Sequence, residues 1–216
     1  MLIPKWDAIV FDLDGTLADT LKDIAKAADQ ALKKNGYPQH KPDQYRIMVG
    51  DGLRKLIERA AGETDAVTVK RIMADFVHFY DRDCLRYTKA YKGMPETLAK
   101  IKDSGIKLLV VTNKPDEQAQ KITAHLYGAD FFEGVYGNRE GRKTKPDPAL
   151  TLGALASAGA SPSRSLFVGD SDVDILTAAN AGMKSAGVTW GFRGKNELVR
   201  AGADYIIDQP CELYLE

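Results

Sequence analysis

The chain has 216 residues, of which 44% are hydrophobic and 28% charged, as in a globular protein with a sizeable core. Its 30 lysines and arginines balance its 30 aspartates and glutamates, which gives no support for a nucleic-acid or membrane-surface protein. The two cysteines, Cys84 and Cys211, lie far apart and imply neither a disulfide framework nor a zinc site. With no signal-like start and no membrane-length apolar run, we expect a cytoplasmic protein.

The first predicted strand, Ala8 to Phe11, runs directly into Asp12-Leu13-Asp14-Gly15. Two carboxylates one residue apart at a strand end must share a proton, bind a cation or stay solvated. Because Asp-Gly is also a common turn dipeptide, this stretch by itself fits either a metal site or an exposed turn. The ends of the later strands decide between the two.

The next part of the chain has a helical period. Apolar residues recur at three- and four-residue steps from Leu17 to Leu32, and Asn35-Gly36 ends that pattern. Two further helical patterns run from Leu53 to Ala60 and from Val69 to Tyr80. We see no convincing strand here, so residues 19–88 are predicted to form a small helical domain.

From Lys92-Gly93 onward, strands alternate with helices. The predicted strands are 106–111, about 134–136, 165–168, 185–188 and 205–207, and the predicted helices are 96–102, 116–126, 149–158 and 173–181. Strands that are apolar on both faces and alternate with helices are typical of a parallel sheet covered on both sides. We therefore predict a doubly wound α/β core made of residues 1–18 and 89–216, with the helical domain inserted after its first strand.

Polar residues follow three of these strands and should meet at one edge of the sheet, where ligands bind in open α/β folds. They are Asp12 and Asp14, Thr112 and Asn113, and Asp170 with Asp174. Carboxylates crowded in this way repel one another unless a cation lies between them, and oxygen ligands favour Mg²⁺ over zinc. Thr112 can donate to a phosphate, Lys145 can neutralise its charge, and a carboxylate can attack phosphorus.

These residues resemble the four motifs of the haloacid dehalogenase superfamily of phosphatases, in the family's order. The motifs are Asp12-Leu13-Asp14-Gly15-Thr16, Thr112, Lys145-Pro146 and Gly169-Asp170-Ser171-Asp172-Val173-Asp174. The helical insertion resembles the family's C1 cap. The stretches Val49-Gly50-Asp51-Gly52-Leu53 and Val188-Thr189-Trp190-Gly191 are similar to the phosphoglycolate phosphatase branch.

The resemblance implies a role for each matching position. Asp12 would be the nucleophile that forms an aspartyl-phosphate, and also a magnesium ligand. Asp14 would be the acid and base, and a ligand through its backbone carbonyl. Thr112 and Asn113 would hold the phosphoryl group with Lys145. Asp170 would bind magnesium directly, while Asp174 would do so through water or by orienting Lys145.

The predicted function is magnesium-dependent hydrolysis of a small phosphate ester, most simply 2-phosphoglycolate. The alternatives are a pyrophosphatase, a sugar-phosphate mutase similar to β-phosphoglucomutase, and, in another class, a regulatory module that has lost turnover. Arg54 is either a ligand for a substrate carboxylate or a solvated helix residue. We expect a monomer or homodimer with no nucleic-acid or membrane partner, and hinges near residues 18–20 and 88–93.

Overall fold

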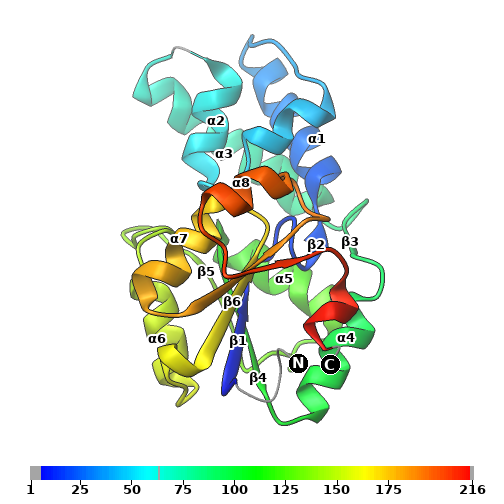
Figure 1. Ribbon diagram of the computed structural model, residues 1–216. Coiled ribbons are helices and arrows are strands. Elements are labelled where there is room, and N and C mark those ends of the chain that lie inside the picture. The colour runs from blue at the N-terminus through cyan, green and yellow to red at the C-terminus, as the bar shows by residue number, and fades with distance from the viewer. Residues whose placement is uncertain (1–5, 63, 215–216) are drawn as a thin grey trace.

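The computed structural model describes residues 6–62 and 64–214, so the ends of the predicted core domain, 1–5 and 215–216, lie outside the described residues. Its centre is a six-stranded parallel sheet with the order β5-β4-β1-β6-β7-β8 (Figure 1). The strands are β1 (Ala8–Phe11), β4 (Lys107–Pro115), β5 (Gly134–Asn138), β6 (Ser165–Gly169), β7 (Lys184–Val188) and β8 (Tyr205–Ile207). The prediction of an α/β fold with a parallel sheet is confirmed.

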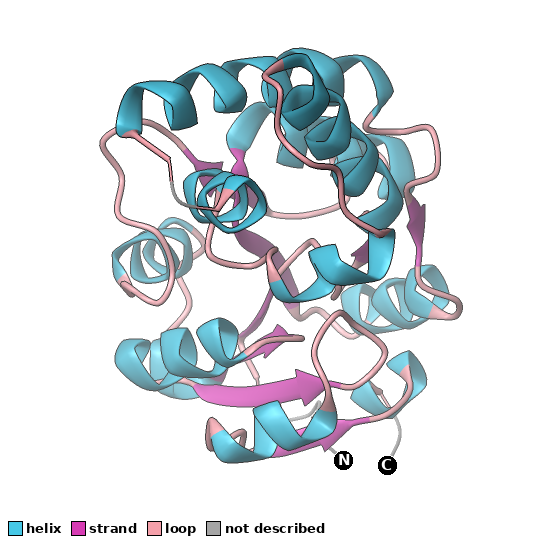
Figure 2. Cartoon of the chain, turned by 90° about the horizontal axis from the view of Figure 1, so that it is seen from above, coloured by secondary structure: helices cyan, strands magenta, loops and turns pink. Residues whose placement is uncertain are grey.

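Helices cover both faces of this sheet, as the view from above shows (Figure 2). They are α4 (Met94–Asp103), α5 (Asp116–Tyr127), α6 (Ala149–Ser157), α7 (Asp172–Ala181) and α8 (Lys195–Arg200). Side chains alternate along β1: Ile9 and Phe11 pack in one apolar cluster, whereas Ala8 and Val10 pack in a second cluster beneath α6 and α7. A strand with two buried faces needs apolar residues at every position, which is why β1 reads as a continuous apolar run.

Between β1 and β4 the chain forms the helical segment 19–88, called the cap below. It contains α1 (Leu21–Lys34), the 3₁₀ helix η2 (Pro42–Ile47), α2 (Leu53–Ala61) and α3 (Ala66–Asp83). Figure 1 shows these helices above the end of the sheet. Two further 3₁₀ helices, η3 (Pro162–Arg164) and η4 (Pro210–Leu213), lie outside the cap.

The two connections between cap and core pair with each other. The short strands β2 (Ala18–Asp19) and β3 (Lys89–Ala90) are antiparallel, with Ala18 opposite Ala90. Nearby, the buried Asp23 carboxylate accepts hydrogen bonds from the backbone N–H groups of Tyr87 and Thr88, at 2.9 and 2.8 Å. The two segments predicted to be hinges, near residues 18–20 and 88–93, therefore lie side by side and are hydrogen-bonded to each other.

The structure differs from the predicted elements in four places. The first helix begins at Leu21 and not at Leu17, because the N–H groups of Thr16, Leu17 and Ala18 all donate to the Leu13 carbonyl and close a turn. The strand predicted to end at residue 111 continues to Pro115, where it pairs with Asn138 after a register shift. The pair β2–β3 and the six-residue α8 were not predicted.

Among the described residues, no helix is long and apolar enough to cross a membrane.

Candidate active site

The central strand β1 delivers Asp12 between the ends of its two neighbours. Phe11 lies opposite Val110 of β4 and Val168 of β6. The next residues of these three strands are therefore neighbours too, and the Asp12 N–H donates to the Val168 carbonyl at 2.9 Å. This alignment places Asp12 beside Val111 and Gly169. Thr112 and Asp170, the residues that follow these two, therefore lie at the same edge of the sheet, where the strand order reverses.

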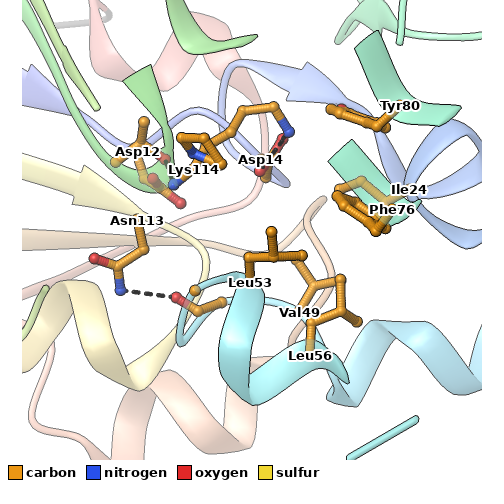
Figure 3. A pocket seen from close by; sticks show the side chains of 14 residues that line it. Asp12, Asp14, Ile24, Val49, Leu53, Leu56, Phe76, Tyr80, Asn113 and Lys114 are labelled. Carbon is orange, nitrogen blue, oxygen red and sulfur yellow. Dashed lines mark hydrogen bonds and ion pairs between the residues drawn. The ribbon is translucent and has the colours of Figure 1, made fainter. Parts of the chain in front are cut away.

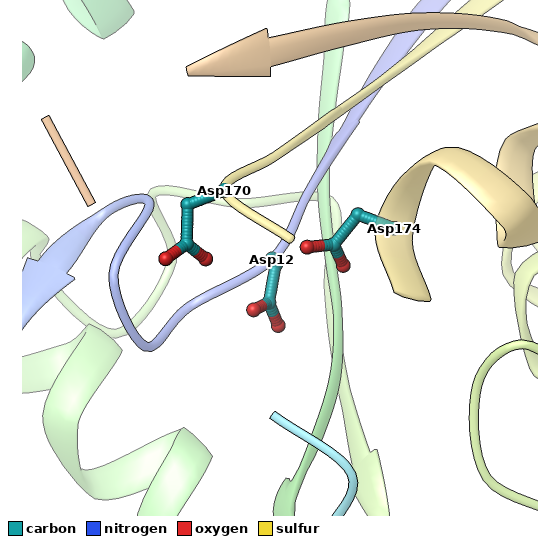
Figure 4. A group of neighbouring side chains, drawn as sticks. All are labelled: Asp12, Asp170 and Asp174. Carbon is teal, nitrogen blue, oxygen red and sulfur yellow. The ribbon is translucent and has the colours of Figure 1, made fainter. Parts of the chain in front are cut away.

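Three carboxylates meet at this edge, as Figure 4 shows. Oxygen atoms of Asp12, Asp170 and Asp174 all lie within 4.8 Å of one another, and all three residues are buried. Burial raises the pKa of Asp170 well above its ordinary value, and the neighbouring Asp174 and Asp12 charges raise it further. A cluster of buried oxygen donors such as this could hold a metal ion.

Backbone and glycine contacts fix the Asp170 carboxylate. It accepts a 2.6 Å hydrogen bond from the Phe192 N–H and a 3.4 Å hydrogen bond from the Thr16 hydroxyl. Gly15 and Gly191 lie against it so closely that a Cβ atom on either would overlap its side chain. Gly15 also has a φ of 85°, a conformation that favours glycine. These contacts hold the Asp170 carboxylate in a single orientation.

Lys145 faces the carboxylates from the other side. Its ammonium nitrogen lies 2.8 Å from Asp12 Oδ1 and 2.7 Å from Asp174 Oδ1, and only 2% of the side chain is exposed. Burial alone would lower the pKa of Lys145, but the Asp12 and Asp174 charges outweigh it and the pKa is raised. Lys145 is thus a buried cation, and Asp174 is further held by Ser171, whose hydroxyl donates to it at 2.7 Å.

The Asn113 side chain positions the backbone around Lys145. Its Oδ1 accepts from the Lys145 N–H at 2.8 Å, while its Nδ2 donates to the carbonyls of Lys145 and of Gly50 in the cap, at 3.2 and 3.0 Å. The side chain therefore joins the Lys145 loop to the cap. Thr112 lies in the same strand, and its hydroxyl accepts from the Lys114 N–H at 3.3 Å.

The sequence reasoning missed Lys114. Its ammonium group donates to both oxygens of the Asp14 carboxylate, at 2.9 and 3.0 Å, and only 3% of its side chain is exposed. Asp14 also accepts a 2.6 Å hydrogen bond from the Thr20 hydroxyl at the start of the cap. The side chain of Asp14 thus points to Lys114 and Thr20 and is not part of the three-carboxylate cluster.

A pocket of about 50 Å³ opens beside these groups, between core and cap (Figure 3). Its polar end contains Asp12, Asp14, Thr112, Asn113 and Lys114. Its opposite wall comes from apolar side chains of the cap, namely Ile24, Val49, Leu53, Leu56 and Phe76, with Tyr80 beside them. The pocket therefore joins a charged end to a wall that offers a ligand few polar contacts.

The structure does not bring Arg54 to this pocket. Leu53 and Leu56 of α2 line the pocket, whereas Arg54 is 47% exposed and forms a 3.6 Å ion pair with Glu58 one turn along the helix. Consecutive helix positions differ by about 100° in direction, so a residue next to Leu53 faces elsewhere. Arg54 occupies the position of a solvated helix residue.

A pair of arginines connects the cap to the loop that contacts Asp170. Arg193 donates to the carbonyls of Arg46, Ile47 and Val49, the last at 2.9 Å. In return, Arg46 donates to the Gly191 carbonyl at 3.2 Å. Because Gly191 packs on Asp170 and Val49 lines the pocket, these contacts couple the cap to the carboxylate cluster.

Comparison with known proteins identifies relatives over nearly the whole chain. Residues 9–188 match the family model described as haloacid dehalogenase-like hydrolase. The chain is 34% identical over 209 residues to the phosphoglycolate phosphatase of Aquifex aeolicus, covering 95% of this chain and 93% of the relative. It is also 34% identical to the N-acetylmuramic acid 6-phosphate phosphatase of Pseudomonas aeruginosa, with 95% and 92% of the two chains covered.

Solved structures share the fold. The structure of a predicted phosphoglycolate phosphatase from Haemophilus somnus aligns with a TM-score of 0.88 at 29% identity, over 97% of this chain and 96% of that one. A haloacid dehalogenase-like hydrolase from Streptococcus pneumoniae aligns with the same score at 25% identity, over 98% of each chain. These matches confirm the prediction of a hydrolase of this fold. The chain belongs to the haloacid dehalogenase-like hydrolase family.

Proposed function

We propose that this enzyme is a magnesium-dependent phosphomonoesterase whose substrate is a small phosphorylated acid. The first candidate for this substrate is 2-phosphoglycolate. The observation that supports this most directly is the position of Asp12, a strand-end carboxylate between the Lys145 ammonium and the Asp170–Asp174 pair. Such an arrangement offers an attacking oxygen together with charges that can hold a phosphoryl group. The phosphatases named among the relatives support the same reaction.

In this proposal, Asp12 and Asp14 divide the chemistry. A carboxylate oxygen of Asp12 attacks phosphorus, the bond to the ester oxygen breaks, and Asp14 gives that oxygen a proton. The product alcohol then dissociates, and the phosphoryl group stays bonded to Asp12. Asp14 then takes a proton from water, which attacks phosphorus and releases phosphate, so that Asp12 returns to its starting form. The hydroxyl of Thr112 and the ammonium of Lys145 hold the phosphoryl oxygens through both steps.

The carboxylate cluster fits Mg²⁺ better than a softer metal. Its donors are carboxylate oxygens, and no histidine or cysteine belongs to the group found among the described residues. Asp12 and Asp170 would contribute side-chain oxygens and Asp14 its backbone carbonyl, while Asp174 would orient Lys145, to which it is already bonded. The bound ion would supply positive charge against the phosphoryl oxygens.

The pocket favours a short substrate over a sugar phosphate. Its wall of Ile24, Val49, Leu53, Leu56 and Phe76 has no side-chain hydrogen-bonding groups for sugar hydroxyls, and an unpaired buried hydroxyl is costly. This apolar wall ranks 2-phosphoglycolate above N-acetylmuramic acid 6-phosphate and above the substrates of a mutase.

The cap completes the proposal. We place the domain boundaries at 19–88 for the cap and at 1–18 and 89–216 for the core, with the β2–β3 pair as the hinge. Motion at this hinge would admit substrate and expel water, as in other enzymes that close over their ligands. A cytoplasmic location and a monomeric or homodimeric state belong to the same proposal, as does the absence of a nucleic-acid partner.

Initial rates of phosphate release test the proposal. With Mg²⁺ present, the panel should contain 2-phosphoglycolate, N-acetylmuramic acid 6-phosphate, pyrophosphate and hexose phosphates, and 2-phosphoglycolate should have the highest kcat/KM. Phosphate release should stop after chelation of the metal and return when Mg²⁺ is restored. Equal rates on all the esters would defeat the narrow assignment, and interconversion of hexose phosphates without phosphate release would indicate a mutase. No release from any compound would favour the regulatory module.

A further inference from the structure

Lys114 is a buried cation that has no role in the proposed reaction. Its side chain is 3% exposed, and its ammonium group bonds to Asp14 at the polar end of the pocket. Among the described residues that line this pocket, it is the one lysine or arginine. Lys145, the other buried cation nearby, contacts Asp12 and Asp174 and is not among the residues that line the pocket. Lys114 is therefore the positive charge that faces the space next to the reaction centre.

Tyr80 provides a second polar group beside Lys114. It comes from α3 of the cap, lines the same pocket and is 2% exposed. Its hydroxyl has no hydrogen-bond partner among the described residues, although buried hydroxyls normally have one. The Lys114 ammonium lies 4.6 Å from the centre of the Tyr80 ring, and Figure 3 shows the two side chains near each other across from Asp12. An ammonium group and an unused hydroxyl thus flank one part of the cavity.

These groups suit an anion that enters with the substrate. The cap side of the pocket is otherwise apolar, and Lys114 is the one cation among the described residues that line it. An anionic group on the substrate would therefore find its charge compensated at Lys114. The anion must lie close to the phosphate ester, because Lys114 is two residues from Thr112 and contacts Asp14. A carboxylate on a short carbon chain meets both conditions.

We propose that the Lys114 ammonium and the Tyr80 hydroxyl form the site that recognises the substrate's carboxylate, and that this carboxylate displaces Asp14 from Lys114. This inference rests on the proposed phosphatase function and names the residues that select its substrate. Asp14 keeps its hydrogen bond from Thr20 while it exchanges partners. Without substrate, Asp14 is ionised and neutralises Lys114. With substrate bound, Asp14 loses this cation, takes up a proton from solvent and turns to the ester oxygen, to which it gives that proton. The carboxylate that confers selectivity therefore also releases the proton carrier.

The test compares 2-phosphoglycolate with ethyl phosphate, which has the same carbon chain and no carboxylate. We expect the wild-type enzyme to prefer the acid by at least about 100-fold in kcat/KM, as for a charge that is paired in a buried site. In Lys114→Met, which removes the ammonium group and keeps most of the side-chain length, this preference should fall by about 100-fold, mainly through KM for the acid. Lys114→Arg should restore part of it.

The result that overturns the inference is an equal loss on both substrates in Lys114→Met, because this would show that Lys114 acts only through Asp14. A wild-type enzyme that hydrolyses both esters without preferring the acid would also overturn it, while leaving the phosphatase function intact. If the wild-type enzyme hydrolyses no phosphate ester at all, the proposed function itself fails.

Tyr80→Phe keeps the inference testable if Lys114→Met does not fold. Removing one hydroxyl should lower kcat/KM for 2-phosphoglycolate about 5- to 10-fold and lower that for ethyl phosphate less. Tyr45→Phe is the matched control, because Tyr45 is also a buried cap tyrosine but donates to Asp29 and does not line the pocket. Its preference for the acid should equal that of the wild type. If Tyr80→Phe prefers 2-phosphoglycolate over ethyl phosphate as strongly as the wild type does, Tyr80 does not belong to the carboxylate site.

Discussion

The ammonium nitrogen of Lys145 lies 2.8 Å from Oδ1 of Asp12, so the proposed nucleophile is held by a buried cation in the structure. Asp174 shares this cation at 2.7 Å, and the three side chains form one charged group at the end of β1 and β6. A substitution here changes both the chemistry and the charge balance of the core. The two effects can be separated by measuring turnover and stability on the same variants.

Asp12→Asn should abolish turnover without unfolding the protein. The amide keeps the size of the side chain but cannot attack phosphorus, so we expect kcat for phosphate release to fall by at least about 10³-fold. Lys145 keeps its contact with Asp174, so the far-UV circular dichroism spectrum and the melting temperature should change little. Activity within tenfold of the wild type would show that Asp12 is not the nucleophile.

The metal-free protein should become more stable as the pH falls from about 7.5 to about 5. Burial raises the pKa of Asp170 above the value of about 3.9 expected in the unfolded chain. In that range the folded protein binds more protons than the unfolded one, so the unfolding free energy rises as the pH falls. Urea unfolding in the presence of EDTA, repeated across the pH range, measures this trend.

Asp170→Asn is the control for the pH trend. It removes the carboxyl group with the raised pKa, so the rise in stability toward pH 5 should become smaller. It should also reduce the increase in melting temperature that Mg²⁺ causes at pH 7.5, because one oxygen donor of the cluster is weakened. A wild-type response to both pH and Mg²⁺ in this variant would contradict the role of Asp170.

Gly191→Ala should weaken metal binding although residue 191 is not a proposed ligand. A Cβ atom at this position would overlap the Asp170 side chain and push it from its hydrogen bond with the Phe192 N–H. We expect at least about a tenfold loss of Mg²⁺ affinity in a titration calorimetry experiment. Gly194→Ala is the matched control, because a Cβ atom there meets nothing within 4 Å. Equal Mg²⁺ affinities in the two variants would contradict the prediction.

Arg193→Met should loosen the contact between the cap and the core. Arg193 donates to three carbonyls of residues 46–49, and these bonds are lost without the guanidinium group. Backbone amides of residues 45–50 should exchange hydrogen faster, and KM should rise several-fold because Val49 and Gly50 line the pocket. Arg200→Met is the control, because among the described residues the Arg200 guanidinium donates to Asn196 of its own helix, α8. Unchanged exchange in Arg193→Met would show that other contacts hold the cap.

The sheet and the residues at its edge could be predicted because both are local signals. Buried strands such as Ala8–Phe11 are short apolar runs, and the parallel arrangement then brings Asp12, Thr112 and Asp170 to one edge. Lys114 could not be found in this way. A lysine after a strand looks solvated in the sequence, and only the fold shows that Asp14 and Tyr80 surround it.

Arg54 is a second case. Its position just past the glycine pair left open whether it binds substrate or is a solvated helix residue, because the direction of a side chain depends on the phase of its helix. In α2 that phase turns Leu53 and Leu56 to the pocket and Arg54 to Glu58. The start of α1 was also misplaced, because the pattern from Leu17 onward cannot show that the backbone first closes a turn on Leu13.

The pairing of β2 with β3 means that the chain leaves the core and returns to it at adjacent points, Ala18 and Ala90. An insertion held in this way can be exchanged for another of different length without moving β1 or β4. Grafting an unrelated helical module between these two residues would therefore replace the pocket wall, together with the cap contacts to Asp14 and Asn113.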